Sequence, residues 1–199
     1  MSRPVVILFA RVPRLGLGKR RLAREVGDRA ALTFARGNLM RIQHRLRALR
    51  GVDRVLATAP DHHARLPARG FTRIGQGGGD LGARMGRAFA RFPRRPVVLI
   101  GADIPGITAG DIRAAFRALR GADAVIGPAP DGGYWLIGMS GRRPGRPFAG
   151  VRWSSPEARA DTERNFAGRR LARLRLLADV DDAAALAAWR GRGVRPRSR

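Results

Sequence analysis

The segment PVVLIGAD, residues 96–103, decides the fold of this chain. Its apolar residues run without alternation, which is typical of a strand buried on both faces of a parallel sheet. Segment 5–10 (VVILFA) has the same character, and segment 54–59 (RVLATA) is predicted to be a strand that ends at Pro60. A weaker strand pattern is present at residues 71–76, and further strands are predicted at residues 122–129, 134–140 and 171–177. The sequence therefore predicts a sheet in which residues 96–103 form the most deeply buried strand.

Helical patterns separate these strands. Apolar residues at helical spacing predict a helix from Asp28 to Leu49 with Asp28 as its N-cap, and Thr108 is predicted to cap a helix that reaches Arg120. Further helices are predicted within residues 11–27, 81–92, 156–166 and 182–189. Strands that alternate with helices predict an α/β fold, a three-layer α/β/α sandwich with a mostly parallel sheet.

The length of 199 residues fits one domain with a single core. We predict that residues 1–190 form this domain and that residues 191–199 form a basic, disordered tail. The chain has no cysteine, which excludes disulfides, cysteine metal sites and thiol catalysis and fits a cytoplasmic enzyme. No stretch approaches the roughly 20 apolar residues of a membrane span.

The charge is strongly positive: 40 basic residues face 15 acidic ones, for a net charge of +25, and Lys19 is the only lysine. Such a field favours polyanions, among them nucleotides, nucleic acids and acidic membrane surfaces. The arginines are spread along the whole chain and are not interleaved with aromatic residues as in single-strand binders. A nucleic-acid-binding or non-catalytic protein is therefore kept as an alternative, and non-specific polyanion binding is expected in any case.

Several polar segments follow predicted strands, and in parallel sheets ligands bind beyond the carboxyl ends of the strands. The loop 11–24 carries six basic residues and two glycines, Gly16 and Gly18, so it is either a phosphate-binding loop or a solvated basic turn. It lacks the Walker A pattern. Asp103 either holds a divalent cation or caps the following turn or helix.

Three other segments carry candidate site residues, each with a structural alternative. In segment 76–85, Asp80 is favoured as a helix N-cap. Asp179 and Asp181 lie on one side of an extended chain, where they either complete a metal site or, for Asp181 with Asp182, cap the last helix. The turn 131–133 (DGG) before a buried strand is either a plain turn or the floor of an active site.

Six ordered segments together carry a family resemblance: FARVPRLGLGKRRL, QGGGDLGARM, IGADIPGIT, GPAPDGGYWLIG, WSSPEARADT and LLADVDD. They resemble the DUF2064 family of bacterial transferases with a single-domain GT-A, Rossmann-like fold. This family is related to arsenosugar-biosynthesis glycosyltransferases and to 2-phospholactate guanylyltransferase. The resemblance extends from about residue 5 to about residue 189. The chain departs from the family's K-T-R-L at Arg20, which replaces a hydroxyl with a charge.

The resemblance implies a transferase that uses a nucleotide-activated donor, a small-molecule acceptor, and Mg²⁺ or Mn²⁺. The implied nucleotide- and phosphate-binding residues are Arg11, Gly16, Lys19, Arg21, Gln76, Asp80 and Arg84. The implied metal ligands are Asp103, Asp179 and Asp181. Gly132, Gly133 and Trp153 would line the acceptor side, with Asp103 and Asp131 as the catalytic carboxylates. Glycosyl transfer from an NDP-sugar is the favoured reaction, and nucleotidyl transfer from an NTP with release of pyrophosphate is the alternative.

Overall fold

The structure is a computed structural model that describes residues 2–61 and 66–193. The predicted tail falls mostly outside these residues, although its first three residues belong to the last helix. The strands are β1 (Val5–Arg11), β2 (Asp53–Ala59), β3 (Thr72–Gly75), β4 (Val97–Gly101), β5 (Ala124–Pro128), β6 (Tyr134–Met139) and β7 (Leu171–Arg173). The helices are α1 (Arg20–Val26), α2 (Asp28–Arg47), α3 (Leu81–Ala90), α4 (Ala109–Ala118), α5 (Ala158–Arg164) and α6 (Ala183–Gly193).

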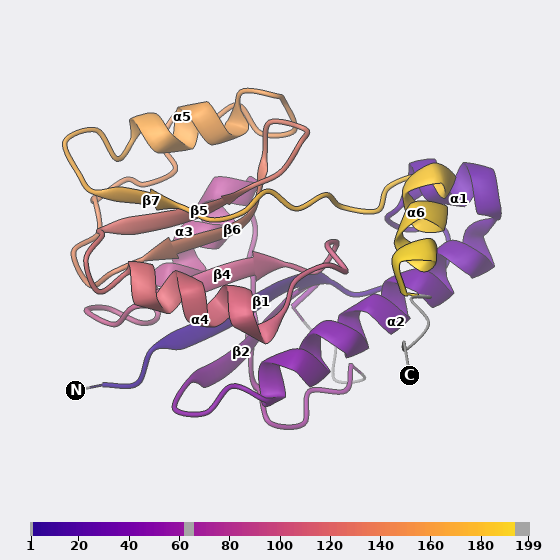
Figure 1. Ribbon diagram of the computed structural model, residues 1–199, viewed down its shortest axis with the longest axis horizontal. Coiled ribbons are helices and arrows are strands. Elements are labelled where there is room, and N and C mark those ends of the chain that lie inside the picture. The colour runs from indigo at the N-terminus through magenta and orange to yellow at the C-terminus, as the bar shows by residue number, and fades with distance from the viewer. Residues whose placement is uncertain (1, 62–65, 194–199) are drawn as a thin grey trace, which may run out of the picture.

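The strands form one sheet in the order β3-β2-β1-β4-β6-β5-β7 (Figure 1). The β3–β2, β2–β1, β1–β4 and β5–β7 pairs are parallel, and β6 alone runs antiparallel, between β4 and β5. The predicted α/β class and mostly parallel sheet are therefore confirmed. The carboxyl ends of six strands consequently lie at the same edge of the sheet, and the candidate site is built there.

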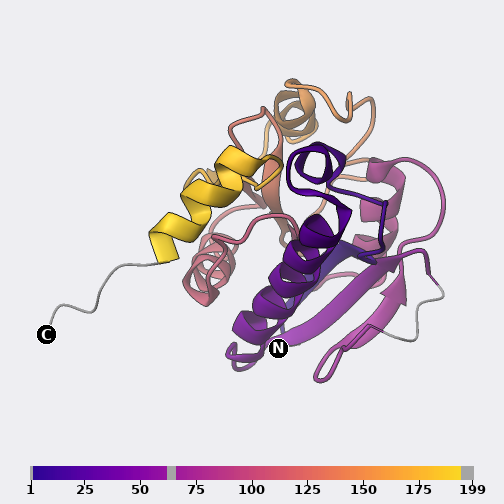
Figure 2. The same ribbon diagram turned by 90° about the vertical axis from the view of Figure 1, so that its right-hand side faces the viewer.

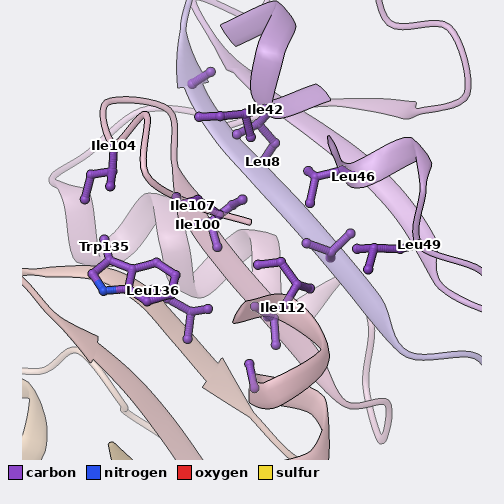
Figure 3. Close-up of a cluster of buried hydrophobic side chains, with 14 of the residues drawn as sticks. Leu8, Ile42, Leu46, Leu49, Ile100, Ile104, Ile107, Ile112, Trp135 and Leu136 are labelled. Carbon is purple, nitrogen blue, oxygen red and sulfur yellow. The ribbon is translucent and has the colours of Figure 1, made fainter. Parts of the chain in front are cut away.

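Helices cover both faces of the sheet, as the three-layer prediction requires. Successive residues of β4 alternate between two cores: Val98 and Ile100 pack under α2 and α4, whereas Val97 and Leu99 pack under α3. Figure 3 shows the first core, where Ile100 lies among Leu8, Ile42 and Ile112. All four of these β4 residues are at most 4% exposed, which confirms a strand buried on both faces.

A third cluster lies outside the sandwich and joins the two ends of the chain. Leu22 of α1, Phe34 of α2 and Leu186 of α6 pack together around Val180. Figure 2 shows α6 and α1 side by side in front of the sheet. A long extended segment, residues 174–182, connects β7 to α6 and crosses the carboxyl edge (Figure 1). We refer to this segment as the crossing segment.

The helix caps test the predicted starting points. Thr108 caps α4 in a full capping box with Asp111, as predicted. Asp28 is not an N-cap, because Gly27 occupies that position with φ of 84° and Asp28 already lies in the first turn of α2. Gly27 ends α1 and begins α2 in a single residue, and its positive φ makes this abrupt turn possible. Side-chain capping signals thus identified the start of α4 correctly and misplaced the start of α2 by one residue.

Candidate active site

The centre of the candidate site is Lys19, whose ammonium group lies between two carboxylates. Its Nζ is 2.8 Å from Oδ1 of Asp181 and 3.1 Å from Oδ1 of Asp103. The Lys19 side chain is 8% exposed, whereas those of Asp103 and Asp181 are 69% and 49% exposed. The basic loop, the end of β4 and the crossing segment thus meet at one charged cluster.

Backbone geometry explains why Lys19 points inward. The residue has φ of 45° and ψ of 38°, a left-handed conformation that follows the positive φ of Gly16 and Gly18. Its carbonyl accepts a hydrogen bond from the backbone N–H of Ala23, which fixes the backbone at the start of α1. Gly16 and Gly18 allow the loop to turn back on itself, because positive φ is unfavourable for other residues.

The carboxylate pair in the crossing segment is arranged by the extended chain. Val180 is buried with Leu22 and Leu186, so Asp179 and Asp181 project together from the other side. Burial and a hydrogen bond with Asp181 raise the pKa of Asp179 to about 6. Burial alone would raise the pKa of Asp181 as well, but hydrogen bonds from Asp179 and Lys19 outweigh burial and hold this pKa below its usual value.

The electrostatics of Lys19 agree with this arrangement. Burial alone would lower the pKa of Lys19, but the charges of Asp103 and Asp181 outweigh burial and raise this pKa above its usual value. Lys19 is therefore an ammonium ion at physiological pH. Asp131 belongs to the same neighbourhood, since its negative charge contributes to the raised pKa of Asp179.

The donor atoms at this cluster fit a hard divalent cation. Asp103, Asp179 and Asp181 offer only carboxylate oxygens, the ligands that Mg²⁺ and Mn²⁺ prefer. The Lys19 ammonium, held by two of these oxygens, is itself a stand-in for a cation at that position. Within residues 2–61 and 66–193, however, no three acidic or histidine side chains form a ready metal site. A metal ion bound through the same oxygens would compete with the Lys19 ammonium.

A second group of candidate residues surrounds Gln76 at the carboxyl ends of the first three strands of the chain. The Gln76 side chain is buried, and its amide donates to the carbonyls of Ala10 and Ala57 at 3.0 and 2.9 Å. Its Oε1 accepts a hydrogen bond from Arg84. Gln76 therefore positions Arg84 and has no amide hydrogen left for a ligand.

Arg84 is the side chain in this group that remains available to an anion. Its guanidinium lies 5.8 Å from the centre of the Phe9 ring, and its Nε is buried without a hydrogen-bond partner in the described part of the chain. Burial and the nearby charge of Arg11 lower the pKa of Arg84. Arg11, the last residue of β1, is exposed beside it. The guanidinium groups of Arg11 and Arg84 repel each other at the carboxyl edge of the sheet. A phosphate bound between them would relieve this repulsion.

The remaining nucleotide candidates lie at helix starts. Asp80 is the N-cap of α3, and its carboxylate accepts from the Ala83 backbone N–H at 2.7 Å, as the capping alternative predicts. Arg21 is exposed on α1, close enough for its charge to lower the pKa of Asp181. Asp182, rather than Asp181, caps the last helix through a 2.7 Å bond from Ala185. Asp182 thus caps α6, whereas Asp181 pairs with Lys19.

The predicted acceptor side is organised by packing within the chain. Asp131 closes its own turn, since its Oδ1 accepts from the Gly133 backbone N–H at 2.9 Å. Gly132 has φ of 83°, and a Cβ added there would lie 2.0 Å from the carbonyl oxygen of Pro156. The close approach at Gly132 is thus made by Pro156. Trp153 is half-buried against Phe148, and its ring would contact a Cβ at position 82.

Tyr134 has a structural role, because it packs against the second core beside α5. Its hydroxyl group accepts a hydrogen bond from Thr162 at 3.4 Å, and burial raises the pKa of Tyr134 well above its usual value. An ionised Tyr134 therefore plays no part in chemistry near neutral pH.

Sequence reasoning missed two residues of α2 that hold the loop carrying Asp103. Asn38 donates to the carbonyl of Ala102 at 2.7 Å, and Arg45 donates to the carbonyls of Pro105 and Ile107 at 2.6 and 2.7 Å. Asn38 is 1% exposed. A polar residue between Phe34 and Ile42 on an apolar helix face was the signal that could have revealed it.

Two shallow hollows are lined by the loop that contains Gly16 and Gly18, and neither is lined by Asp103, Asp179 or Asp181. The smaller one reaches from Pro13 and Lys19 to Leu32 and Ala35 of α2. The larger one lies between the loop and the α1–α2 turn and is bordered by Gly16, Gly18, Arg20, Ala23, Arg24, Gly27 and Asp28. Within the described ranges 2–61 and 66–193, no helix is long and apolar enough to cross a membrane.

Comparison with known proteins identifies the fold and the family. No curated protein matches the sequence. A structure of a candidate nucleotide-diphospho-sugar transferase from Desulfovibrio desulfuricans G20 is 29% identical with a TM-score of 0.87, covering 99% of this chain and 90% of that one. CMP:2-keto-3-deoxy-manno-octonic acid synthetase complexed with CTP is 15% identical with a TM-score of 0.59, covering 96% and 98%.

A third similar structure, Rv0371c from Mycobacterium tuberculosis H37Rv in complex with manganese, is 14% identical with a TM-score of 0.55 and covers 94% of this chain and 97% of that one. Residues 42–155 match the family described as "Uncharacterized protein conserved in bacteria (DUF2064)". The chain is thus an enzyme with the fold of nucleotide-diphospho-sugar transferases, and it belongs to the DUF2064 family.

Proposed function

We propose that the protein is a metal-dependent glycosyltransferase that uses an NDP-sugar donor and a small-molecule acceptor. The observation that carries the proposal is the contact of Lys19 with Asp103 and Asp181 at the carboxyl edge of the sheet. In transfer from an NDP-sugar, the acceptor oxygen bonds to the anomeric carbon and the nucleoside diphosphate leaves. Cations and metal-binding carboxylates at one place assist departure of this leaving group, and no cysteine or serine nucleophile is needed. The 29% identical candidate nucleotide-diphospho-sugar transferase supports the same assignment.

The residues then have distinct tasks. Lys19, Arg11 and Arg21 bind the donor phosphates, and Arg84, held by Gln76, adds a further cation. Asp103, Asp179 and Asp181 would hold Mg²⁺ or Mn²⁺, which would neutralise charge on the phosphate leaving group. The Rv0371c complex with manganese supports a metal in this fold.

In this proposal the acceptor binds on the side of Asp131. This carboxylate is exposed, lies near Asp179, and is held in its turn by Gly133. Asp131 would orient the acceptor hydroxyl and accept its proton as the donor bond breaks. Trp153 supplies an apolar wall, and Gly132 fixes the turn against Pro156.

Nucleotidyl transfer is the second candidate, because the similar CMP:2-keto-3-deoxy-manno-octonic acid synthetase was solved with CTP. The same cations and carboxylates serve both reactions, since each has a phosphate leaving group. Release of a nucleoside diphosphate from an NDP-sugar identifies glycosyl transfer. Release of pyrophosphate from an NTP identifies nucleotidyl transfer.

The first test is a thermal-shift panel of NTPs and NDP-sugars with and without Mg²⁺ or Mn²⁺. We expect at least one nucleotide to raise the melting temperature only when metal is present. Asp103→Asn should abolish this metal-dependent shift, because it removes a charged ligand of the metal. The matched control Asp53→Asn, at the amino end of β2, should retain the shift.

Binding of DNA without any nucleotide effect would contradict the transferase proposal. If duplex DNA raises the melting temperature while no nucleotide does so, and Asp103→Asn changes nothing, the protein is a nucleic-acid-binding protein and not a transferase. Its net charge of +25 makes this control necessary, because positive fields bind polyanions without specificity.

A further inference from the structure

The ammonium group of Lys19 contacts carboxylate oxygens that the proposed metal ion would also use. Its Nζ contacts one oxygen of Asp103 and one of Asp181, at 3.1 and 2.8 Å. These two aspartates are proposed metal ligands, so the role inferred for Lys19 rests on the proposed function. An ammonium and a divalent cation repel each other and cannot share two carboxylate oxygens at these distances.

The protein supplies Lys19 as the cation that neutralises these carboxylates before any metal binds. The lysine is 8% exposed while its partners are open to solvent, so it lies beneath the carboxylates on the protein side. Asp103 and Asp181 are brought from β4 and the crossing segment, and without Lys19 their charges would face each other together with that of Asp179.

The backbone of Lys19 is fixed, whereas its long side chain, held only through its ammonium group by the two carboxylates, can change rotamer when a stronger anion draws that group away. The left-handed backbone is held between Gly18 and the first turn of α1, where the carbonyl of Lys19 bonds Ala23. The four-carbon stem of lysine rotates easily, and its ammonium binds as a point charge with no fixed geometry. Rotation of the side chain therefore moves the charge away from the carboxylates without unfolding α1.

We propose that Lys19 is an internal counter-ion that couples metal binding to nucleotide binding. In the free protein it neutralises Asp103 and Asp181 and weakens metal binding. When a nucleotide binds, its phosphates draw the ammonium away, and the vacated oxygens of Asp103 and Asp181 would then be open to a divalent cation. Linkage makes the effect reciprocal, so metal binding releases Lys19 for the phosphates and strengthens nucleotide binding by the same factor.

The test measures Mn²⁺ affinity of the full-length protein without nucleotide, from the electron paramagnetic resonance signal of free Mn²⁺. Lys19→Met should bind Mn²⁺ about tenfold more tightly than the parent, because the competing ammonium is gone. Lys19→Arg keeps the charge and should bind no more tightly than the parent. Arg24→Met changes the net charge equally on the exposed side of α1 and should stay within about twofold of the parent.

The Mn²⁺ affinities of the parent and the variants distinguish failure of the counter-ion role from failure of the transferase proposal. Equal affinity of the parent and Lys19→Met, or weaker binding by Lys19→Met, overturns the counter-ion role and leaves the transferase proposal standing. Tighter binding by Lys19→Arg overturns it as well, even if Lys19→Met fails to fold. If no variant binds Mn²⁺ while nucleotides raise the melting temperature only with metal, the counter-ion role of Lys19 is wrong and the transferase proposal stands. Absence of both signals removes the proposed function too.

Discussion

At the scale of single residues, the turn at Gly132 shows how a local signal can have either of two meanings. A glycine before a buried strand predicts close approach by another group, but it does not say which group. Here the neighbour is the backbone of Pro156, and the Gly132 carbonyl accepts a hydrogen bond from Arg159 at 3.0 Å. The turn therefore fastens the segment before α5 beside the carboxyl end of β5.

Gly132→Ala should destabilise the protein by about 2 kcal/mol or more, since the new Cβ meets fixed backbone and φ is positive. The neighbouring Gly133→Ala is the matched control, because its Cβ would be 3.1 Å from the movable Asp131 carboxylate and its φ is not in the left-handed region. We expect it to cost less than about 1 kcal/mol. Urea unfolding of both variants measures the difference, and equal losses would contradict the close-contact argument.

At the scale of elements, a buried carboxylate joins α5 to the loop that carries Trp153. Asp161 is 2% exposed and accepts two side-chain bonds and one backbone bond from Arg152, at 2.8 to 3.1 Å. Arg164 adds a further bond at 2.8 Å. These bonds hold the pKa of Asp161 far below its usual range.

This lowered pKa predicts how stability depends on pH. The unfolded chain takes up a proton at Asp161 near pH 3.9, whereas the folded protein resists protonation. The contribution of Asp161 is therefore complete above about pH 5 and is lost as the pH falls toward the folded pKa. Asp161→Asn should flatten the fall of the urea midpoint between about pH 5 and pH 3. Asp28→Asn, on the exposed first turn of α2, serves as the control, and an unchanged slope in Asp161→Asn would refute the assignment.

At the scale of the whole molecule, the net charge of +25 acts against folding through self-repulsion. Among the ion pairs of the described residues, two acids are each shared by two arginines: Arg152 and Arg164 share Asp161, and Arg159 and Arg173 share Glu163. Basic residues outnumber acidic ones by 40 to 15, so the acids are too few to pair one-to-one with the basic residues.

Added salt should therefore stabilise the protein. We expect the melting temperature to rise between about 0.02 and 0.5 M KCl, because the screening length falls below about 10 Å within this range. Differential scanning calorimetry measures the effect. A steady fall of the melting temperature would mean that the ion pairs, such as Arg175 with Asp111, contribute more than the repulsion that salt removes.

Much of the fold followed from local patterns, and the reason is that these patterns reflect burial. Continuous apolar runs identified β1 and β4, helical spacing identified α2, and Thr108 as a cap identified the start of α4. The antiparallel direction of β6 could not be read from its composition, because a strand buried between two neighbours is apolar whichever way it runs. The N-terminal boundary of α2 was missed because Gly27 begins the helix without a side-chain cap.

The sequence by itself determined the alternation of strands and helices, the carboxyl edge on which polar residues gather, and the excess of positive charge. Only the tertiary structure decided that Lys19 meets Asp181, 162 positions away, and that Asp182 and not Asp181 caps α6. The physical reason is the crossing segment, whose direction is set by long-range contacts such as the bond from Leu177 to the Pro128 carbonyl and the burial of Val180. Local propensity encodes an extended chain, but only packing determines where that chain delivers its carboxylates.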